Sequence, residues 1–261
     1  MAEDTLSPAL ITTNLDTRFI GQKIIYHPRL TSTMAVARQA ARQGAAEGTV
    51  VVADEQTAGK GRLKRLWLSP RGSLALSIIL YPDMSYLPYL MMLASLAVAH
   101  SIEAITGLKA QLKWPNDVLI NDKKVCGILI DSDLRGNKVA YTIIGIGINV
   151  NFRLADFSEI LATATSLADE LKKDVSRVAV IRHLLVETER LYLALPDGDP
   201  IYREWQGKLV TLGKKVQVKS GETFLEGIAE SVARDGSLLL RHSDGSVTSI
   251  VAGDVTLRDY K

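Results

Sequence analysis

The chain has 261 residues, of which 47% are hydrophobic and 23% are charged, and its formal net charge is +2. That composition is typical of a globular protein with one large domain and a smaller one, and it excludes an intrinsically disordered chain. A net charge so close to zero argues against nucleic acid as a bulk partner.

The single cysteine and the apolar segments bear on where the protein works. Cys126 cannot form a disulfide within the chain, which favours a reducing, cytoplasmic setting, and its apolar neighbours predict a small buried side chain. The N-terminus carries Glu3 and Asp4 and lacks a basic start followed by an apolar core, so we expect no signal peptide. The uncharged stretch 84–102 contains Pro88 and is rich in alanine, which favours a buried core helix over a membrane span.

In chain order, the first 22 residues show no clear periodicity. Apolar runs predict strands at 23–26, 49–53 and 74–80. Helical patterns ended by glycines predict helices at 32–44, capped by Ser32 or Thr33, and at 88–105. A long polar segment separates the second strand from the third.

From residue 110 onward, short apolar runs alternate with turn sequences. This pattern predicts a meander of antiparallel strands up to residue 151, not alternating strands and helices. Helical patterns return at 166–171 and 176–193, the stretch 197–200 breaks the chain, and a short helix runs through Trp205. The last fifty residues contain short strands spaced by glycine turns, which predicts a separate five-stranded barrel.

The polar segment DEQTAGKGRLKRLWLSPRGS, residues 54–73, carries the strongest chemical signal. It holds Gly59, Gly61 and Gly72 with the cations Lys60, Arg62, Lys64, Arg65 and Arg71. Glycines allow close backbone approach, and cations beside exposed N–H groups bind phosphate or carboxylate. The segment is not a P-loop, because it lacks that spacing and leads into a strand. On composition alone, a solvated basic loop is the alternative.

Two further motifs could face a ligand. KWPNDV at 113–118 puts Lys113 at a strand end, where its charge can point into a cleft, although most such lysines merely decorate hairpins. GIGINVN at 145–151 has two glycines inside an apolar strand, which indicates a bulge, a ligand against the backbone or tight sheet packing. The four histidines lack metal-ligand spacing, and no nucleophile–base pair supports covalent catalysis.

Together these motifs resemble the biotin protein ligase family. STM at 32–34 looks like the family's S-T-N, and EQTAGKGRLKR at 55–65 is similar to its Q-x-x-G-R-G-R-x-x-R loop. KWPNDV, KVCGIL at 124–129 and GIGINVN match in order and spacing. The resemblance is specific from residue 24 to 151 and looser beyond, where AGDVTLR resembles the closing barrel strand.

The resemblance implies an α+β fold. It consists of a catalytic domain like that of class II aminoacyl-tRNA synthetases, with a mixed or antiparallel sheet and helices, and a small C-terminal SH3-like β-barrel. The expected boundaries are an N-terminal extension at 1–22, the catalytic domain at 23–208 and the barrel at 209–261.

The implied activity has two steps and needs ATP, biotin and Mg²⁺. Biotin is first activated to biotinyl-5′-AMP and is then transferred to a lysine of a biotin carboxyl carrier protein of acetyl-CoA carboxylase or a related carboxylase. Both reactants of the first step are anions, so cations and backbone donors suit the chemistry better than a nucleophile does. A cytoplasmic enzyme with no nucleic-acid or membrane partner is expected. A further expectation is a homodimer formed by pairing the strand near 139–150, a long apolar strand expected at a sheet edge.

The resemblance also implies which residues form the site. Biotin is expected to contact Ser32, Thr33, Met34, Gln56, Gly59, Lys60, Gly61, Arg62, Lys124 and Gly127. ATP and the adenylate are expected to contact Arg62, Arg65, Trp67, Lys113, Asn116, Lys124 and Asn149. Catalysis is assigned to Lys113, Arg62 and Asp117, and Asp117 is also the candidate Mg²⁺ ligand.

Three positions depart from the family pattern. Lys60 stands where arginine is usual, Lys64 where glycine is common, and Met34 where asparagine is usual. A lipoate ligase is the nearest alternative, since it shares the fold and the acyl-adenylate logic. A biotin-sensing DNA-binding repressor is less favoured, because about 22 residues before the matched region are too few for a helix-turn-helix domain. A catalytically inactive binding module is disfavoured by the retained Arg62 and Lys113.

Overall fold

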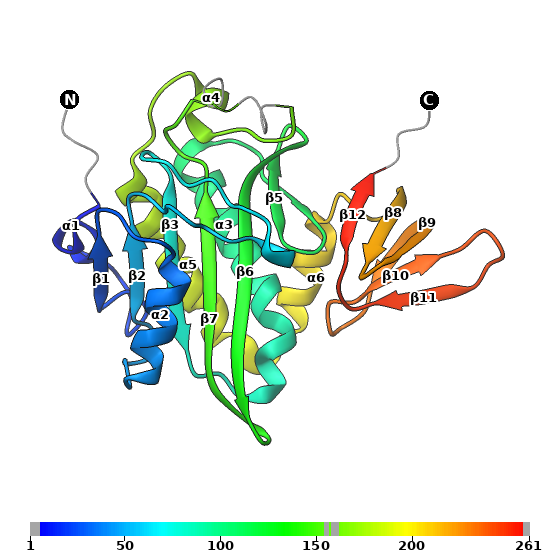
Figure 1. Cartoon of the computed structure of the whole chain (residues 1–261), viewed down its shortest axis with the longest axis horizontal. Helices are drawn as coiled ribbons and strands as arrows, with labels where there is room; N and C mark the ends of the chain where they lie inside the picture. The colour runs from blue at the N-terminus through cyan, green and yellow to red at the C-terminus, as the bar shows by residue number, and fades with distance from the viewer. Residues whose placement is uncertain (1–5, 154–156, 158–161, 258–261) are drawn as a thin grey trace.

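The computed structural model describes residues 6–153, 157 and 162–257. It contains a seven-stranded mixed sheet with helices on both faces and a five-stranded antiparallel sheet toward the C-terminus (Figure 1). The mixed α+β architecture expected from the sequence is confirmed at this level.

The elements before residue 81 form one edge of the large sheet. They are α1 (Pro8–Thr12), β1 (Ile24–His27), α2 (Thr33–Arg42), β2 (Val50–Ala53), the short 3-10 helix η1 (Arg62–Lys64) and β3 (Leu74–Leu80). β1 and β2 pair in parallel, and β2 and β3 pair antiparallel. α1 is a short helix in a segment that shows no periodicity in the sequence.

The described part of the expected N-terminal extension is built into the main core. Leu6, Ile11 and Ile20 are fully buried in the largest apolar cluster. The buried carboxylate of Glu189 accepts the backbone N–H groups of residues 18, 19 and 20 at 2.6, 2.9 and 2.9 Å. Because one side chain satisfies three backbone donors, this segment is held against α5 (Arg177–Leu193).

The apolar stretch near residues 84–105 forms a core helix, as predicted. A 3-10 helix, η2 (Met84–Tyr89), leads into α3 (Leu90–Thr106), which ends where Gly107 adopts φ 72°. Met84–Thr106 is long and apolar enough to cross a membrane by length and composition, and 61% of its most apolar window is buried inside the protein. α3 packs against the large sheet on one side and against α5 and α6 (Asp199–Lys208) on the other.

The predicted meander is confirmed. β4 (Gln111–Lys113), β5 (Asp117–Ile120), β6 (Lys123–Arg135) and β7 (Lys138–Ile148) pair consecutively and antiparallel, in the sheet order β1-β2-β3-β7-β6-β5-β4. The expectation that the strand near 139–150 lies at a sheet edge is wrong, because β7 is paired with β3 on one side and β6 on the other.

Alternation along the central strands separates two apolar layers. Val50 and Val52 face the large cluster that contains α3 and α5, whereas Val51 faces a smaller cluster under α2. Figure 1 shows α2 in front of the sheet and the other long helices behind it.

After β7 the chain forms α4 (Leu167–Leu171), α5, the 3-10 helix η4 (Leu195–Asp197) and α6. The break expected at 197–200 is only partly present. Pro200 lies in the first turn of α6, where its missing N–H costs no hydrogen bond.

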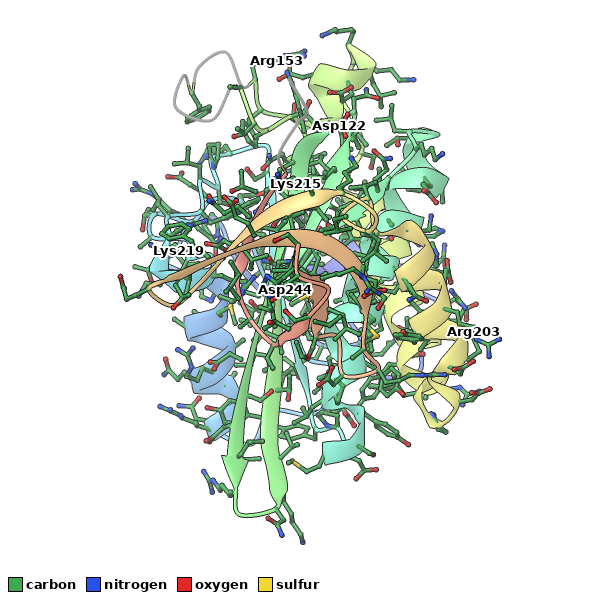
Figure 2. The ribbon with its side chains drawn as sticks, turned by 90° about the vertical axis from the view of Figure 1, so that its right-hand side faces the viewer. Asp122, Arg153, Arg203, Lys215, Lys219 and Asp244 are labelled. Atoms are coloured by element: carbon green, nitrogen blue, oxygen red, sulfur yellow. The ribbon has the colours of Figure 1, made fainter. Side chains whose placement is uncertain are left out.

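The C-terminal sheet has the predicted five strands. These are β8 (Lys215–Ser220), β9 (Thr223–Val232), β10 (Leu238–Arg241), β11 (Val247–Ile250) and β12 (Asp254–Leu257), in the order β11-β10-β9-β8-β12. Figure 2 views the molecule from the side of this sheet, on which Lys219 and Asp244 lie. Buried Trp114 joins it to the large sheet, because its Nε1–H donates to Gly236 O at 2.9 Å and its N–H donates to Thr211 Oγ1 at 3.0 Å.

Candidate active site

The glycine-rich segment 54–73 is a long hairpin-like loop between β2 and β3. Its arms are joined by hydrogen bonds from Gln56 N–H to Ser69 O (3.0 Å), from Trp67 N–H to Gly59 O (2.9 Å) and from Gly61 N–H to Arg65 O (2.8 Å). The tip is η1, in which one residue has the left-handed φ of 53°. The loop is therefore ordered by its own backbone up to a tight, exposed turn.

Two adjoining cavities lie under this loop. The first measures about 170 Å³ and the second about 520 Å³. The first alone is lined by Ser32, Thr33, Met34, Gln56, Lys60, Gly61, Arg62, Asn116 and Gly127 among the predicted site residues. The second alone is lined by Lys113 and Asn149 among them. Both are lined by Arg65, Trp67, Asp117 and Lys124.

The structure thus brings nearly all predicted site residues together and divides them between two compartments. The predicted biotin contacts lie mainly in the first cavity, and Lys113 and Asn149, predicted to contact the nucleotide, lie in the second. Gly59 lines neither cavity. A Cβ there would lie 2.5 Å from Trp67 O, so this glycine permits the close approach of the two loop arms. The Lys64 side chain lies outside what the structure describes.

Polar groups at one end of the first cavity form a short hydrogen-bonded chain. Gln56 Oε1 accepts the Thr33 N–H at 2.9 Å and its hydroxyl at 3.2 Å, and Ser77 Oγ donates to Thr33 Oγ1 at 2.9 Å. Ser32 is the N-cap residue of α2, but its hydroxyl makes no capping bond. This hydroxyl and the Gln56 amide nitrogen are polar groups suited to a ligand with its own donors and acceptors.

The glycines of GIGINVN make room for side chains. A Cβ on Gly147 would lie 2.3 Å from Trp67 Nε1, and a Cβ on Gly145 would lie 2.7 Å from Met34 Sδ. Gly147 pairs with Gly127, whose Cβ would also meet the Trp67 ring, at 3.1 Å. Tight packing, one of the readings open from the sequence, accounts for both glycines of the strand.

Cations and carboxylates alternate along the wall between the cavities. Lys124 Nζ lies 2.6 Å from Asp117 Oδ1 and 5.3 Å from the centre of the Trp67 ring. Arg65 pairs with Asp254 of β12 at 2.5 Å. Arg62 donates to Gly253 O at 3.1 Å and to Asn116 Oδ1 at 3.4 Å. The C-terminal sheet therefore contributes Asp254 directly to the lining of the first cavity.

Burial lowers the pKa of the Arg62 guanidinium, and the nearby carboxylates of Asp254 and Asp117 oppose that shift. An arginine remains charged in proteins, so Arg62 is a partly desolvated cation beside the first cavity. Asp254 was missed as a site residue, although the motif AGDVTLR that contains it was recognised. The signal was a match to a strand and carried no information about contact with the loop.

The structure also bears on Asn149, on metal binding and on Cys126. Asn149 is buried and donates its Nδ2–H to Thr165 O at 2.9 Å, so its amide nitrogen is engaged within the protein. Within the described ranges, no group of three or more His, Cys, Asp or Glu side chains could hold a metal ion. Cys126 is buried as predicted, and burial raises the pKa of its thiol, so it is no nucleophile.

Comparison with known proteins points in one direction. Residues 26–149 match the model of the Biotin/lipoate A/B protein ligase family, and residues 211–258 match that of the Biotin protein ligase C terminal domain. Bifunctional ligase/repressor BirA of Bacillus subtilis (strain 168) is 38% identical over 258 residues, which is 97% of this chain and 79% of that protein. Biotin--[acetyl-CoA-carboxylase] ligase of Paracoccus denitrificans is 32% identical over 83% of this chain and 93% of its own length.

A solved structure agrees with these sequence matches. Biotin protein ligase from Aquifex aeolicus in complex with biotin and ATP is 32% identical and superposes with a TM-score of 0.77. The match covers 92% of this chain and 100% of that one.

Proposed function

The chain belongs to the biotin protein ligases of the biotin/lipoate A/B protein ligase family, and from this premise we propose that its two cavities hold the two substrates of an ATP-dependent biotinylation. The biotin carboxylate attacks the α-phosphate of ATP, which forms biotinyl-5′-AMP and releases pyrophosphate. A lysine amine of a biotin carboxyl carrier protein then attacks the mixed anhydride, which forms an amide and releases AMP.

The observation that carries this proposal is the pair of adjoining cavities with a charged wall between them. Biotin fits the first cavity, where Ser32, Thr33 and Gln56 present hydrogen-bonding groups to its polar rings. ATP fits the larger second cavity beside Lys113 and Asn149. The reacting carboxylate and α-phosphate then meet at the shared wall.

The shared wall suits the chemistry of two anions. Arg65 and Lys124 line both cavities, and Arg62 adds a partly desolvated cation to the first. Fixed cations offset the repulsion between the reactants and stabilise the charge that develops at the phosphate, without a covalent enzyme intermediate.

Mg²⁺ belongs to the proposal as a companion of ATP. It is commonly bound through one or two carboxylates plus substrate phosphates, so a single acidic group fits it better than a cage does. Asp117 lines both cavities and is the residue that would hold it. When bound, the ion neutralises phosphate charge.

Further parts of the proposal follow from the family resemblance. They are a catalytic domain of the class II aminoacyl-tRNA synthetase type, an SH3-like C-terminal barrel, a cytoplasmic location, and no nucleic-acid or membrane partner.

A homodimer is also proposed, formed through a different strand from the one that the sequence analysis expected. β5 pairs with β6 only over Lys123–Gly127, which leaves the outer half of β6 as one edge that a second copy could pair with. Light scattering at micromolar concentration tests the dimer, and a monomer with and without ligands would contradict it.

The decisive assay is transfer of labelled biotin to a purified carboxyl carrier domain. We expect labelled carrier only when MgATP is present, and pyrophosphate release that depends on biotin. Lipoate in place of biotin is the control that separates this activity from lipoate ligation. Folded protein that leaves the carrier unlabelled would contradict the proposed function.

A further inference from the structure

One arginine that lines neither cavity joins the two ends of the glycine-rich loop. Arg177, the first residue of α5, donates from Nη1 to Asp54 Oδ1 at 2.9 Å and to Ser73 O at 3.0 Å. Asp54 directly follows β2, and Ser73 directly precedes β3. A single guanidinium nitrogen therefore contacts the first and the last residue of the loop.

This contact lies just beyond the last paired residues of β2 and β3. β2 and β3 pair as far as Ala53 with Ala75, and the next backbone hydrogen bond between the two arms runs from Gln56 N–H to Ser69 O. Arg177 contacts both arms in the intervening stretch, through Asp54 on one side and Ser73 on the other. The first arm is also held by backbone hydrogen bonds between residues 54–58 and residues 27–31, and Arg177 adds the link between the two ends of the loop.

The arrangement is electrostatically costly, so its partners are needed. Arg177 is only 6% exposed and lies in the first turn of a helix, where the helix dipole disfavours a cation. Asp54 offsets this cost and also accepts the Tyr26 hydroxyl at 2.5 Å. Burial and that hydrogen bond raise the pKa of Tyr26 to about 12, so it stays a neutral donor at working pH.

A second contact ties the same helix start to the end of the loop. Asn151 N–H donates to Gly72 O at 2.8 Å. Its side chain accepts the Val175 N–H at 2.8 Å and donates to Val175 O at 2.7 Å. The approach to α5 is thus hydrogen-bonded to the loop end through both Asn151 and Arg177.

We propose that Arg177 is a positioning residue for adenylation, which holds both ends of the glycine-rich loop so that the loop cations meet the substrates in the right place. Arg177 lines neither cavity, and its effect therefore passes through the loop. The inference rests on the proposed function for its kinetic consequence, whereas its effect on loop order does not depend on that function.

The test compares Arg177→Lys and Arg177→Gln with Arg190→Gln, a matched control on the same helix. Arg190 makes an exposed ion pair with Glu187. Lysine keeps the charge but carries it on a compact ammonium at the end of a flexible stem, in place of the rigid guanidinium whose Nη1 contacts both Asp54 and Ser73. Amide hydrogen exchange of residues 55–72 is measured in the ligand-free protein. The half-life of bound biotinyl-5′-AMP, the KM for biotin, kcat and the thermal midpoint are measured beside it.

We expect exchange in 55–72 to rise about tenfold in Arg177→Lys, with β3 and β7 unchanged and adenylate lost about tenfold faster. The control should behave as the parent does. Asp54→Asn should raise loop exchange through the same contact, so its effect should not add to that of Arg177→Lys. The double variant should exchange no faster than the faster of the two single variants.

Parent-like loop exchange and parent-like adenylate retention in Arg177→Lys would overturn the inference. So would a rise in exchange spread equally over β3, β7 and the loop, because that indicates general destabilisation. If Arg177→Gln does not fold, the lysine variant carries the test. If the parent itself forms no adenylate, the proposed function fails, while loop exchange still tests the positioning role.

Discussion

Lys113 and Lys124 were both expected at the site, and they line different sets of cavities. Lys113 lines only the second cavity, whereas Lys124 lines both and pairs with Asp117. Lys113→Ala should therefore slow adenylation with little change in biotin affinity. Lys124→Ala should reduce both, with a loss in rate of roughly 10²–10³-fold. Pyrophosphate release under single turnover and equilibrium biotin binding measure the two effects. A loss of biotin affinity in Lys113→Ala equal to that in Lys124→Ala would contradict this division.

Gly147 allows the Trp67 indole to lie against the sheet. Because an added Cβ would come within 2.3 Å of Trp67 Nε1, Gly147→Ala should displace the indole toward solvent. The other two tryptophans, Trp114 and Trp205, are each 2% exposed, so a rise in acrylamide quenching would report on Trp67. Gly207→Ala is the control, because a Cβ there meets nothing within 4 Å. Equal quenching in parent and Gly147→Ala would show that the indole does not need this space.

At the scale of elements, the glycine-rich loop is held at its tip as well as at its ends. Arg65 pairs with Asp254, and Arg62 donates to the neighbouring Gly253 O. Asp254→Asn removes the charge of this tie, so the ligand-free loop should open more often and be cut several-fold faster by trypsin. The cleavage sites are Lys60, Arg62, Lys64 and Arg65.

Asp244→Asn is the matched control for the loop tie. It lies in the turn between β10 and β11 of the same sheet (Figure 2), and its carboxylate accepts the Ser246 N–H at 2.9 Å. Biotin with MgATP should slow cleavage of the parent, because anions bring the loop cations together. Identical cleavage rates in parent and Asp254→Asn would mean that this ion pair does not restrain the tip.

The sequence predicted local elements well, and β3 was predicted to the residue because Leu74–Leu80 is an unbroken apolar run between turn signals. Nearly all of the site residues that it predicted through the family motifs line one of the two cavities. It could not predict the contacts of Arg177 with Asp54 or of Arg62 with Gly253, which join positions 123 and 191 residues apart. Neither periodicity nor propensity carries information at that range. A helix as short as α1 shows too little periodicity to detect. Pro200 was taken as part of a break because proline occurs both in chain breaks and in the first turn of a helix.

At the scale of the whole molecule, Trp114 joins the two sheets. It comes from KWPNDV, so the motif that supplies Lys113 and Asp117 also anchors the C-terminal sheet. Trp114→Phe keeps an apolar ring but leaves the Gly236 carbonyl without its donor, which should cost roughly 1–3 kcal/mol of stability. Guanidinium unfolding measures the loss, and hydrogen exchange should place it in β8–β12. Trp205→Phe, at a second buried indole, is the control. A loss confined to β4 and β5 would contradict the anchoring role.

The wall shared by the two cavities makes their occupancies interdependent. The ligand in one cavity changes the surroundings of the ligand in the other when it moves a shared side chain, and the shared side chains include Arg65, Trp67, Asp117 and Lys124. Thermodynamic linkage then requires reciprocity, so the factor by which biotin changes the affinity for a non-hydrolysable ATP analogue equals the factor by which the analogue changes the affinity for biotin. We expect this factor to exceed one, because the first anion to arrive draws the loop cations into place for the second. Calorimetric titrations in both orders measure it. A factor of one would mean that the loop responds to each ligand independently, and the cavities would then be neighbours without cooperativity.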